Sequence, residues 1–104
     1  MTTPAQILSA VESATGVAPD VIKADCRTAQ VSIARFLAML LYAESRPFAS
    51  NLDAALSVGK IDPSTGRHGL MRARHLMEND ADFQIAHGKA TTILGDSLPT
   101  AASN

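Results

Sequence analysis

Apolar residues recur every three or four positions along most of this chain, in segments that Gly, Pro and small polar residues separate. Such spacing places apolar side chains on one face of an α-helix. The pattern predicts helices at about 4–14, 19–23, 28–44, 51–57 and 63–78, and a last helix after 79. We therefore expect an all-α domain of five to six helices over residues 1–94. Small and polar residues with a proline predict a disordered tail at 95–104.

The segment 28–44 is the most apolar part of the chain and contains neither Gly nor Pro. Its apolar residues cover most of the helix circumference: Val31, Ile33, Ala34, Phe36, Leu37, Ala38, Leu40, Leu41 and Tyr42. A helix that is apolar on nearly all sides is buried, so we expect this one at the centre of the fold. Arg35 interrupts the apolar run, and we expect its side chain to reach out along an edge or to pair with an acid.

Three of the predicted helices begin with capping residues. Thr3 can cap the first helix, and Gln6 can close a capping box with it. Ser50 and Asp62 stand in the same position before helices 51–57 and 63–78, and a proline at the first helical position follows Asp62. These local signals predict where the helices begin.

Helix 63–78 is expected to have an inner and an outer face. The inner face is formed by Gly66, Leu70, Ala73 and Met77, and the outer face by Arg67, His68, Met71, Arg72 and His75. Gly66 and Gly69 each cost about 1 kcal/mol relative to alanine inside a helix. They indicate either the close approach of another surface or a frayed helix start, and the sequence leaves both open.

The helices before and after helix 63–78 have shorter apolar faces. We expect these faces from Leu52, Ala55 and Leu56 in helix 51–57, and from Phe83, Ile85, Ala86 and Ile93 in the last helix. Helix 51–57 is also short and rich in alanine, so it can pack closely.

The composition excludes several classes of protein. Hydrophobic residues make up 46% of the chain but aromatic residues only 4%, so the core is aliphatic, which suits packed helices. Cys26 is the only cysteine, which excludes an internal disulfide and a cysteine-based metal site. No apolar run reaches the ~18–20 residues that a membrane span needs, and no signal-type segment starts the chain. We expect a cytoplasmic protein that does not enter a membrane.

The charge is unevenly distributed along the chain. The formal net charge is −1, but Lys60, Arg67, Arg72 and Arg74, opposed only by Asp62, give the segment 60–74 a charge of +3. A local basic stripe on a near-neutral protein can mark a DNA-contact surface. A solvated helix face has the same appearance, and the charge does not distinguish the two.

Helices 51–57 and 63–78, joined by a short segment that contains a glycine, have the pattern of a helix-turn-helix unit. In such a unit the second helix enters the major groove by its N-terminal end, where Ser64 and Thr65 would approach the DNA. The free N–H groups of a helix start also attract phosphate. An ordinary helical hairpin has the same pattern, so this interpretation stays open beside the first.

Metal binding and catalysis have little support in the sequence. His68 and His75 are seven residues apart, roughly 10 Å along a helix axis, which is too far to share one tetrahedral ion. His87 has no local partner, and Cys26 has no histidine nearby in sequence that could act as its base. No Gly-rich phosphate loop follows a strand, because no strand is predicted. We expect no enzyme, no metal site and no cofactor.

Several short motifs of the chain share one register with a known family. They are Ile7 to Val11, Gly16 and Val17, Val21 to Lys23, Arg27 and Thr28, Ala34 to Leu41, Asp62 to Thr65, and His68. In this register, over about residues 7–83, the chain resembles the C-terminal DNA-binding domain of the bacterial replication initiator DnaA. That domain is a Trp-repressor-like helix-turn-helix domain, and the resemblance implies the same fold here.

The resemblance also implies a site for double-stranded DNA. Carried over by position, it assigns Asp62, Ser64, Thr65 and His68 to the family's recognition signature and Arg27 to its basic loop. We add Lys60, Arg67 and Arg72 as contacts to the DNA backbone. The set of candidate DNA-binding residues is therefore Arg27, Lys60, Asp62, Ser64, Thr65, Arg67, His68 and Arg72.

The chain departs from the family at three positions of this site. Ile61, Pro63 and Gly66 stand where the family has arginine, histidine and valine. Loss of an arginine that reads a base costs about 1–3 kcal/mol of discrimination, so we expect origin-box specificity to be altered or lost. The alternative is a protein-interaction module that kept the fold and lost DNA binding.

The rest of the initiator has no counterpart in these residues. No ATPase motif is present, so we expect no ATP site. Met1 and the tail favour a stand-alone relative, and a fragment of a longer protein is the alternative. From the implied DNA binding we expect association with the nucleoid and a regulatory role in replication or transcription. A protein partner and a homo-oligomer both stay open.

Overall fold

The structure is a computed structural model that describes residues 2–25 and 28–96. These residues form six helices: α1 (Pro4–Thr15), α2 (Pro19–Lys23), α3 (Ala29–Ser45), α4 (Asn51–Ser57), α5 (Pro63–Asn79) and α6 (Ala81–Asp96). The described ranges contain no strand. The all-α prediction is confirmed, and the first five helices begin and end within one residue of the predicted bounds.

The predicted boundary of the tail is wrong by two residues. Gly95 and Asp96 belong to α6, which ends at Asp96. The remaining tail prediction, 97–104, lies outside the described residues.

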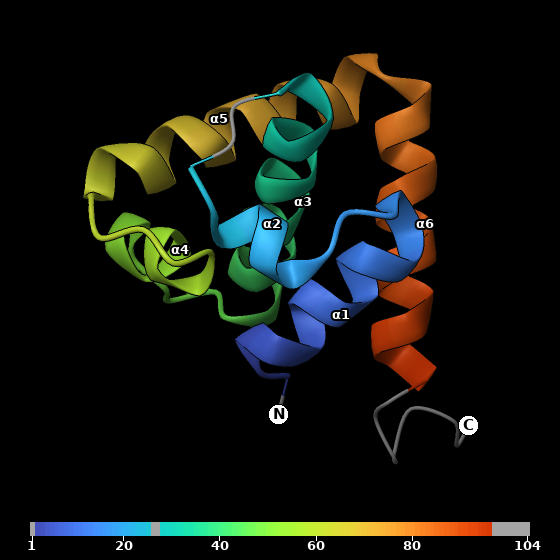
Figure 1. Cartoon of the computed structure of the whole chain (residues 1–104), viewed down its shortest axis with the longest axis horizontal. Coiled ribbons are helices and arrows are strands. Elements are labelled where there is room, and N and C mark those ends of the chain that lie inside the picture. Colours follow the sequence, from blue (N-terminus) through green and yellow to red (C-terminus); the bar gives the residue numbers. More distant parts are fainter. Residues whose placement is uncertain (1, 26–27, 97–104) are drawn as a thin grey trace.

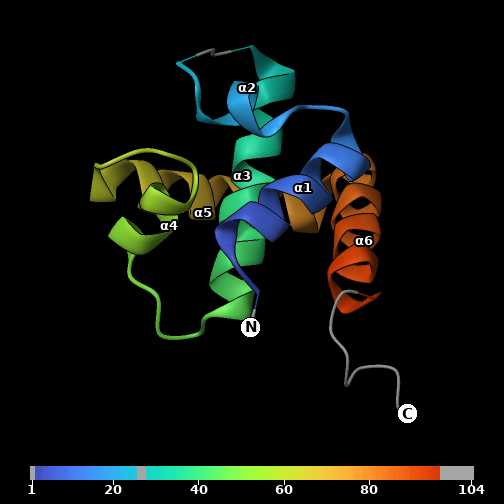
Figure 2. The same ribbon diagram turned by 60° about the horizontal axis from the view of Figure 1, so that its bottom comes forward.

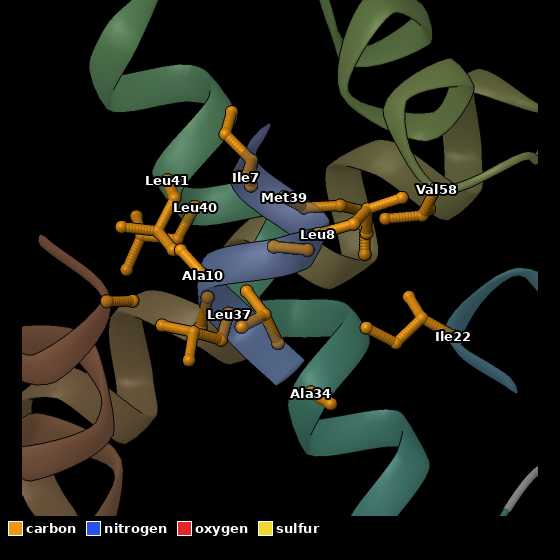
Figure 3. Close-up of a cluster of buried hydrophobic side chains, with 14 of the residues drawn as sticks. Ile7, Leu8, Ala10, Ile22, Ala34, Leu37, Met39, Leu40, Leu41 and Val58 are labelled. Carbon is orange, nitrogen blue, oxygen red and sulfur yellow. The ribbon is translucent and has the colours of Figure 1, made fainter. Parts of the chain in front are cut away.

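Helix α3 is at the centre of the fold, as its apolar pattern predicts. It contacts each of the other five helices. Figures 1 and 2 show α1 and α6 on one side of it and α4 with the start of α5 on the other. Its buried side chains are Val31, Ala34, Arg35, Leu37, Ala38, Met39, Leu40 and Leu41. Figure 3 shows part of the aliphatic core, where side chains of α3 such as Leu37 and Met39 lie among those of α1, α2 and Val58, the residue after α4.

The predicted helix caps are present at the starts of α1 and α4. The Gln6 N–H donates to Thr3 Oγ1 at 3.2 Å, and the Thr3 N–H donates to Gln6 Oε1 at 2.8 Å. Ser50 and Asp53 form the same reciprocal pair at α4, at 3.1 and 3.0 Å. Each pair satisfies two N–H groups that have no partner within the helix.

Three apolar residues lie on the surface, contrary to prediction. Leu52 and Leu56 of α4 are exposed, whereas Ala54, Ala55 and Val58 are buried. Helix α4 packs closely on α5, so the side facing the core accepts small residues and the leucines take the opposite side. Ile85 of α6 is likewise exposed, while Phe83 is buried.

None of the helices in the described part of the chain has both the length and the apolar character that crossing a bilayer requires.

Candidate nucleic-acid interface

Helices α4 and α5 are joined by a tight turn over residues 58–62. Gly59 adopts a left-handed conformation with φ of 79°, and its N–H donates to the Leu56 carbonyl at 3.0 Å. The Lys60 N–H donates to the Ala55 carbonyl at 2.9 Å. A glycine in this conformation ends α4 and reverses the chain without the penalty that a side chain would add.

Close approach of two surfaces explains both glycines of α5. A Cβ added at Gly66 would overlap the main-chain carbonyl of Asn51 in α4. A Cβ added at Gly69 would overlap the end of the Met39 side chain in α3. Helix α5 is regular from Pro63 onward, so the alternative of a frayed start is wrong. The inner side of α5 is therefore set tightly against α3 and α4.

The outer face of α5 is open to solvent. All five residues that the sequence assigned to this face are exposed, and so is Ser64. The five are Arg67, His68, Met71, Arg72 and His75. Thr65 is half-buried. Between the cap Asp62 and Glu78 this helix carries three arginines, two histidines and no acidic residue. The exposed face is consequently cationic over about four turns.

A shallow hollow lies along this face. It is lined by Ser64, Arg67, His68 and Met71 and has a volume of about 360 Å³. These four residues follow one another at helical spacing and so form one row on the helix surface. The His68 ring packs edge-on against the Phe36 ring of α3, with the ring centroids 6.2 Å apart. This contact fixes the inner side of the His68 ring.

Asp62 caps α5. Its carboxylate accepts the Ser64 N–H at 2.9 Å, and its main-chain carbonyl accepts the Thr65 N–H at 3.0 Å. The Ser64 N–H therefore already donates to the Asp62 carboxylate, and a phosphate at the helix start would have to compete for this donor. This gives Asp62, a candidate DNA-binding residue, a structural role that its sequence position already suggested.

We predict that Asp62→Ala lowers the free energy of unfolding by about 1 kcal/mol, the usual cost of losing an N-cap. Asp62→Asn keeps a side-chain oxygen that can accept the Ser64 N–H, so it should retain most of the stability. Urea unfolding followed by far-UV circular dichroism measures both variants. An equal loss in the two would show that the charge, rather than the cap, is what stabilises the helix start.

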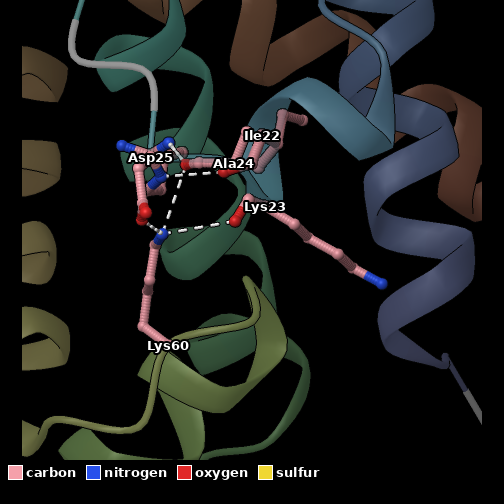
Figure 4. Close-up of polar contacts among 6 residues, drawn as sticks. Ile22, Lys23, Ala24, Asp25 and Lys60 are labelled. Carbon is pink, nitrogen blue, oxygen red and sulfur yellow. Dashed lines mark hydrogen bonds and ion pairs between the residues drawn. The ribbon is translucent and has the colours of Figure 1, made fainter.

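Lys60 links the turn before α5 to the end of α2 (Figure 4). Its ammonium group donates to the Lys23 and Ala24 carbonyls, each at 3.2 Å, and to Asp25 Oδ1 at 3.1 Å. An ammonium group has three donors, and these bonds use all of them. Only 22% of the Lys60 side chain is exposed. A DNA phosphate would reach Lys60 only by taking the place of one of these acceptors.

The sequence left two arrangements open for Arg35, and the first of them, in which the side chain reaches out along an edge of α3, is wrong. The residue is only 9% exposed, and it donates from Nε to the Ile22 carbonyl at 2.9 Å and from Nη2 to the Ala24 carbonyl at 2.8 Å. The last carbonyls of a helix have no partner within it, and the planar guanidinium satisfies two at once. Arg35 thereby fixes α2 against α3. The partners are 11 and 13 residues away, so no local pattern indicates them.

Two positions singled out in the sequence, Cys26 and Arg27, lie outside the described residues. The other seven candidates divide by their surroundings. Ser64, Arg67, His68 and Arg72 are exposed on the outer face, Thr65 lies at its edge, and Lys60 and Asp62 make the intramolecular bonds given above. Among the residues that the structure describes, no three His, Cys, Asp or Glu side chains form a group that could hold a metal ion.

Comparisons of the chain with protein-family models, with curated proteins and with solved structures find no match. The resemblance to the DnaA C-terminal domain therefore stays a prediction from the sequence motifs. The function has to be inferred from the residues of α5 and its neighbours.

Proposed function

We propose that the chain binds double-stranded DNA by inserting the outer face of α5 into the major groove. The observation that carries this proposal is the face itself, which is exposed, acid-free and cationic from Ser64 to His75. A helix with its side chains is about 10–12 Å wide, which fits a major groove about 12 Å wide. In a helix-turn-helix unit the second helix lies in the major groove while the first crosses the DNA backbone, and α4 would take the place of that first helix.

The residues of the face divide into two roles. Arg67 and Arg72 contact phosphates, because a guanidinium donates two parallel hydrogen bonds to phosphate oxygens. Ser64, Thr65 and His68, nearest the start of α5, reach base edges. Lys60 and Asp62 act indirectly, by fixing the turn and the helix start. By its resemblance to the DnaA domain, Arg27 adds a contact from the loop before α3. Such a domain would serve regulation in replication or transcription.

The test is the salt dependence of binding to a duplex of about 20 base pairs. Several phosphate contacts predict a log–log slope of Kd against salt steeper than about 3 in magnitude. Arg67→Gln and Arg72→Gln should each weaken binding and reduce the slope by about one. Lys89→Gln on α6 removes the same charge away from the face and should leave the slope unchanged. Fluorescence anisotropy at several salt concentrations measures all four proteins.

A protein-interaction module is the second candidate function. It is favoured by apolar side chains exposed on α4 and the loops beside it: Phe48, Leu52, Leu56 and Ile61. If no member of a random duplex library binds at low salt, DNA binding is overturned and this function takes its place. Equal slopes for the Arg67, Arg72 and Lys89 variants would remove α5 from the interface.

A further inference from the structure

Met71 is an apolar residue in the middle of the cationic face. It is 57% exposed, and it is the only large hydrophobic residue of α5 that is exposed. Arg67 and His68 precede it by one turn and His75 follows it by one turn, so its neighbours on the surface are polar. The hydrophobic core and the apolar residues packed on it do not include Met71. Folding therefore does not explain a methionine at this position.

The hollow on α5 supplies a second observation. Met71 forms its apolar part, and Ser64, Arg67 and His68 form its polar part. Such a surface suits a ligand edge that carries a small apolar group beside a hydrogen-bond acceptor. In the major groove, thymine presents a C5-methyl group next to its O4 acceptor.

We propose that Met71 contacts the 5-methyl group of a pyrimidine in the major groove, and that the domain favours thymine at that position. The inference rests on the proposed DNA binding and specifies what one residue of that face recognises. A methionine side chain is flexible and polarisable, so it adapts to a methyl group without a preformed pocket. The cationic neighbours hold the backbone on either side and bring the base edge to it.

The test uses a duplex selected from a random library by the unmodified chain. Each thymine is replaced in turn by deoxyuridine, which removes only the methyl group. At one position we expect Kd to rise about fourfold, the loss that corresponds to one buried methyl-sized group. For Met71→Ala, the same replacement should change Kd by less than a factor of 1.5, because the side chain that contacts the methyl group is gone. At the other thymines, the effects of the replacement and of Met71→Ala should add.

Ile85→Ala is the matched control. Ile85 is also 57% exposed and apolar, but it belongs to α6, so this variant should keep the fourfold response. Both variants change a surface side chain, and circular dichroism checks that both are folded. Met71→Leu, which keeps an apolar side chain, should restore most of the response.

A further arm identifies the source of the methyl group. Cytosine and 5-methylcytosine are compared at the responding position. A gain with methylation, lost in Met71→Ala, supports the contact and extends it to methylated cytosine; no gain confines the contact to thymine.

The test separates a failure of the Met71 contact from a failure of the proposed DNA binding. If Met71→Ala responds to deoxyuridine as strongly as the unmodified chain, or if no thymine responds, the role of Met71 is overturned while DNA binding stands. If no duplex binds, the proposed function and this inference are both overturned.

Discussion

Gly66→Ala is expected to lower the free energy of unfolding by at least about 2 kcal/mol, within the range of overpacked cores. The new Cβ would overlap the carbonyl of Asn51. Because this carbonyl belongs to the main chain of α4, no side-chain rotation relieves the overlap, and α4 and α5 have to separate. Helix propensity alone predicts the opposite sign, since alanine is favoured over glycine by about 1 kcal/mol. Urea unfolding followed by circular dichroism measures the change.

Gly88→Ala is the control for this prediction. Gly88 is also inside a helix, but a Cβ there would meet no atom within 4 Å, so propensity should decide and stability should rise by up to about 1 kcal/mol. Gly69→Ala should fall between the two, because its Cβ overlaps the flexible end of Met39. If Gly66→Ala and Gly88→Ala both stabilise the protein, the close contact between α4 and α5 is wrong.

Arg35→Met should lower the free energy of unfolding by about 3 kcal/mol, because it removes the two hydrogen bonds that a charged donor gives to the Ile22 and Ala24 carbonyls. Methionine keeps most of the volume, so the loss reports the hydrogen bonds rather than a cavity. Arg35→Lys should recover only part of the stability, because an ammonium group cannot reproduce the planar pair of donors. The end of α2, where Ile22 and Ala24 accept these bonds, should lose hydrogen-exchange protection first.

Arg72→Met provides the matched comparison. Arg72 is exposed on α5, and exposed substitutions of this kind change stability by no more than about 0.5 kcal/mol. A loss in Arg35→Met as small as that in Arg72→Met would show that the buried guanidinium does not hold α2 to α3.

The helices could be predicted from the sequence because their limits are local. Thr3, Ser50 and Asp62 cap the residues that follow them, and Gly16 and Gly59 end helices in left-handed conformations. Each signal lies within four residues of the boundary it sets. The burial of α3 could also be predicted, since it follows from the apolar residues that cover most of its circumference.

Contacts between distant parts of the chain could not be predicted. Lys60 and Asp25 are 35 residues apart, and His87 bonds Glu44, 43 residues away, at 2.7 Å. The surface position of Leu56 depends on how closely α5 approaches α4, which is a property of the packed pair. Local periodicity says which residues share a face, but not which face the rest of the molecule covers.

The candidate site was predictable to the same extent. Periodicity placed Arg67, His68 and Arg72 on one open side of α5. It could not indicate that the ammonium group of Lys60 is bound by three oxygens within the chain. Periodicity therefore indicated which side of α5 is exposed, and the structure separated the candidate side chains that are exposed from those that make bonds within the chain.

The missing side chain at Gly66 has a mechanical consequence. At this contact the main chain of α5 lies directly against the main chain of α4, with no side chain between them that could change its rotamer. Helix α4 and the start of α5 should therefore move as one rigid body. A duplex bound there as proposed could not be accommodated by a change in the angle between the two helices. Adjustment of shape would fall on the nucleic acid, and the elastic energy of bending or widening it would become part of sequence selection.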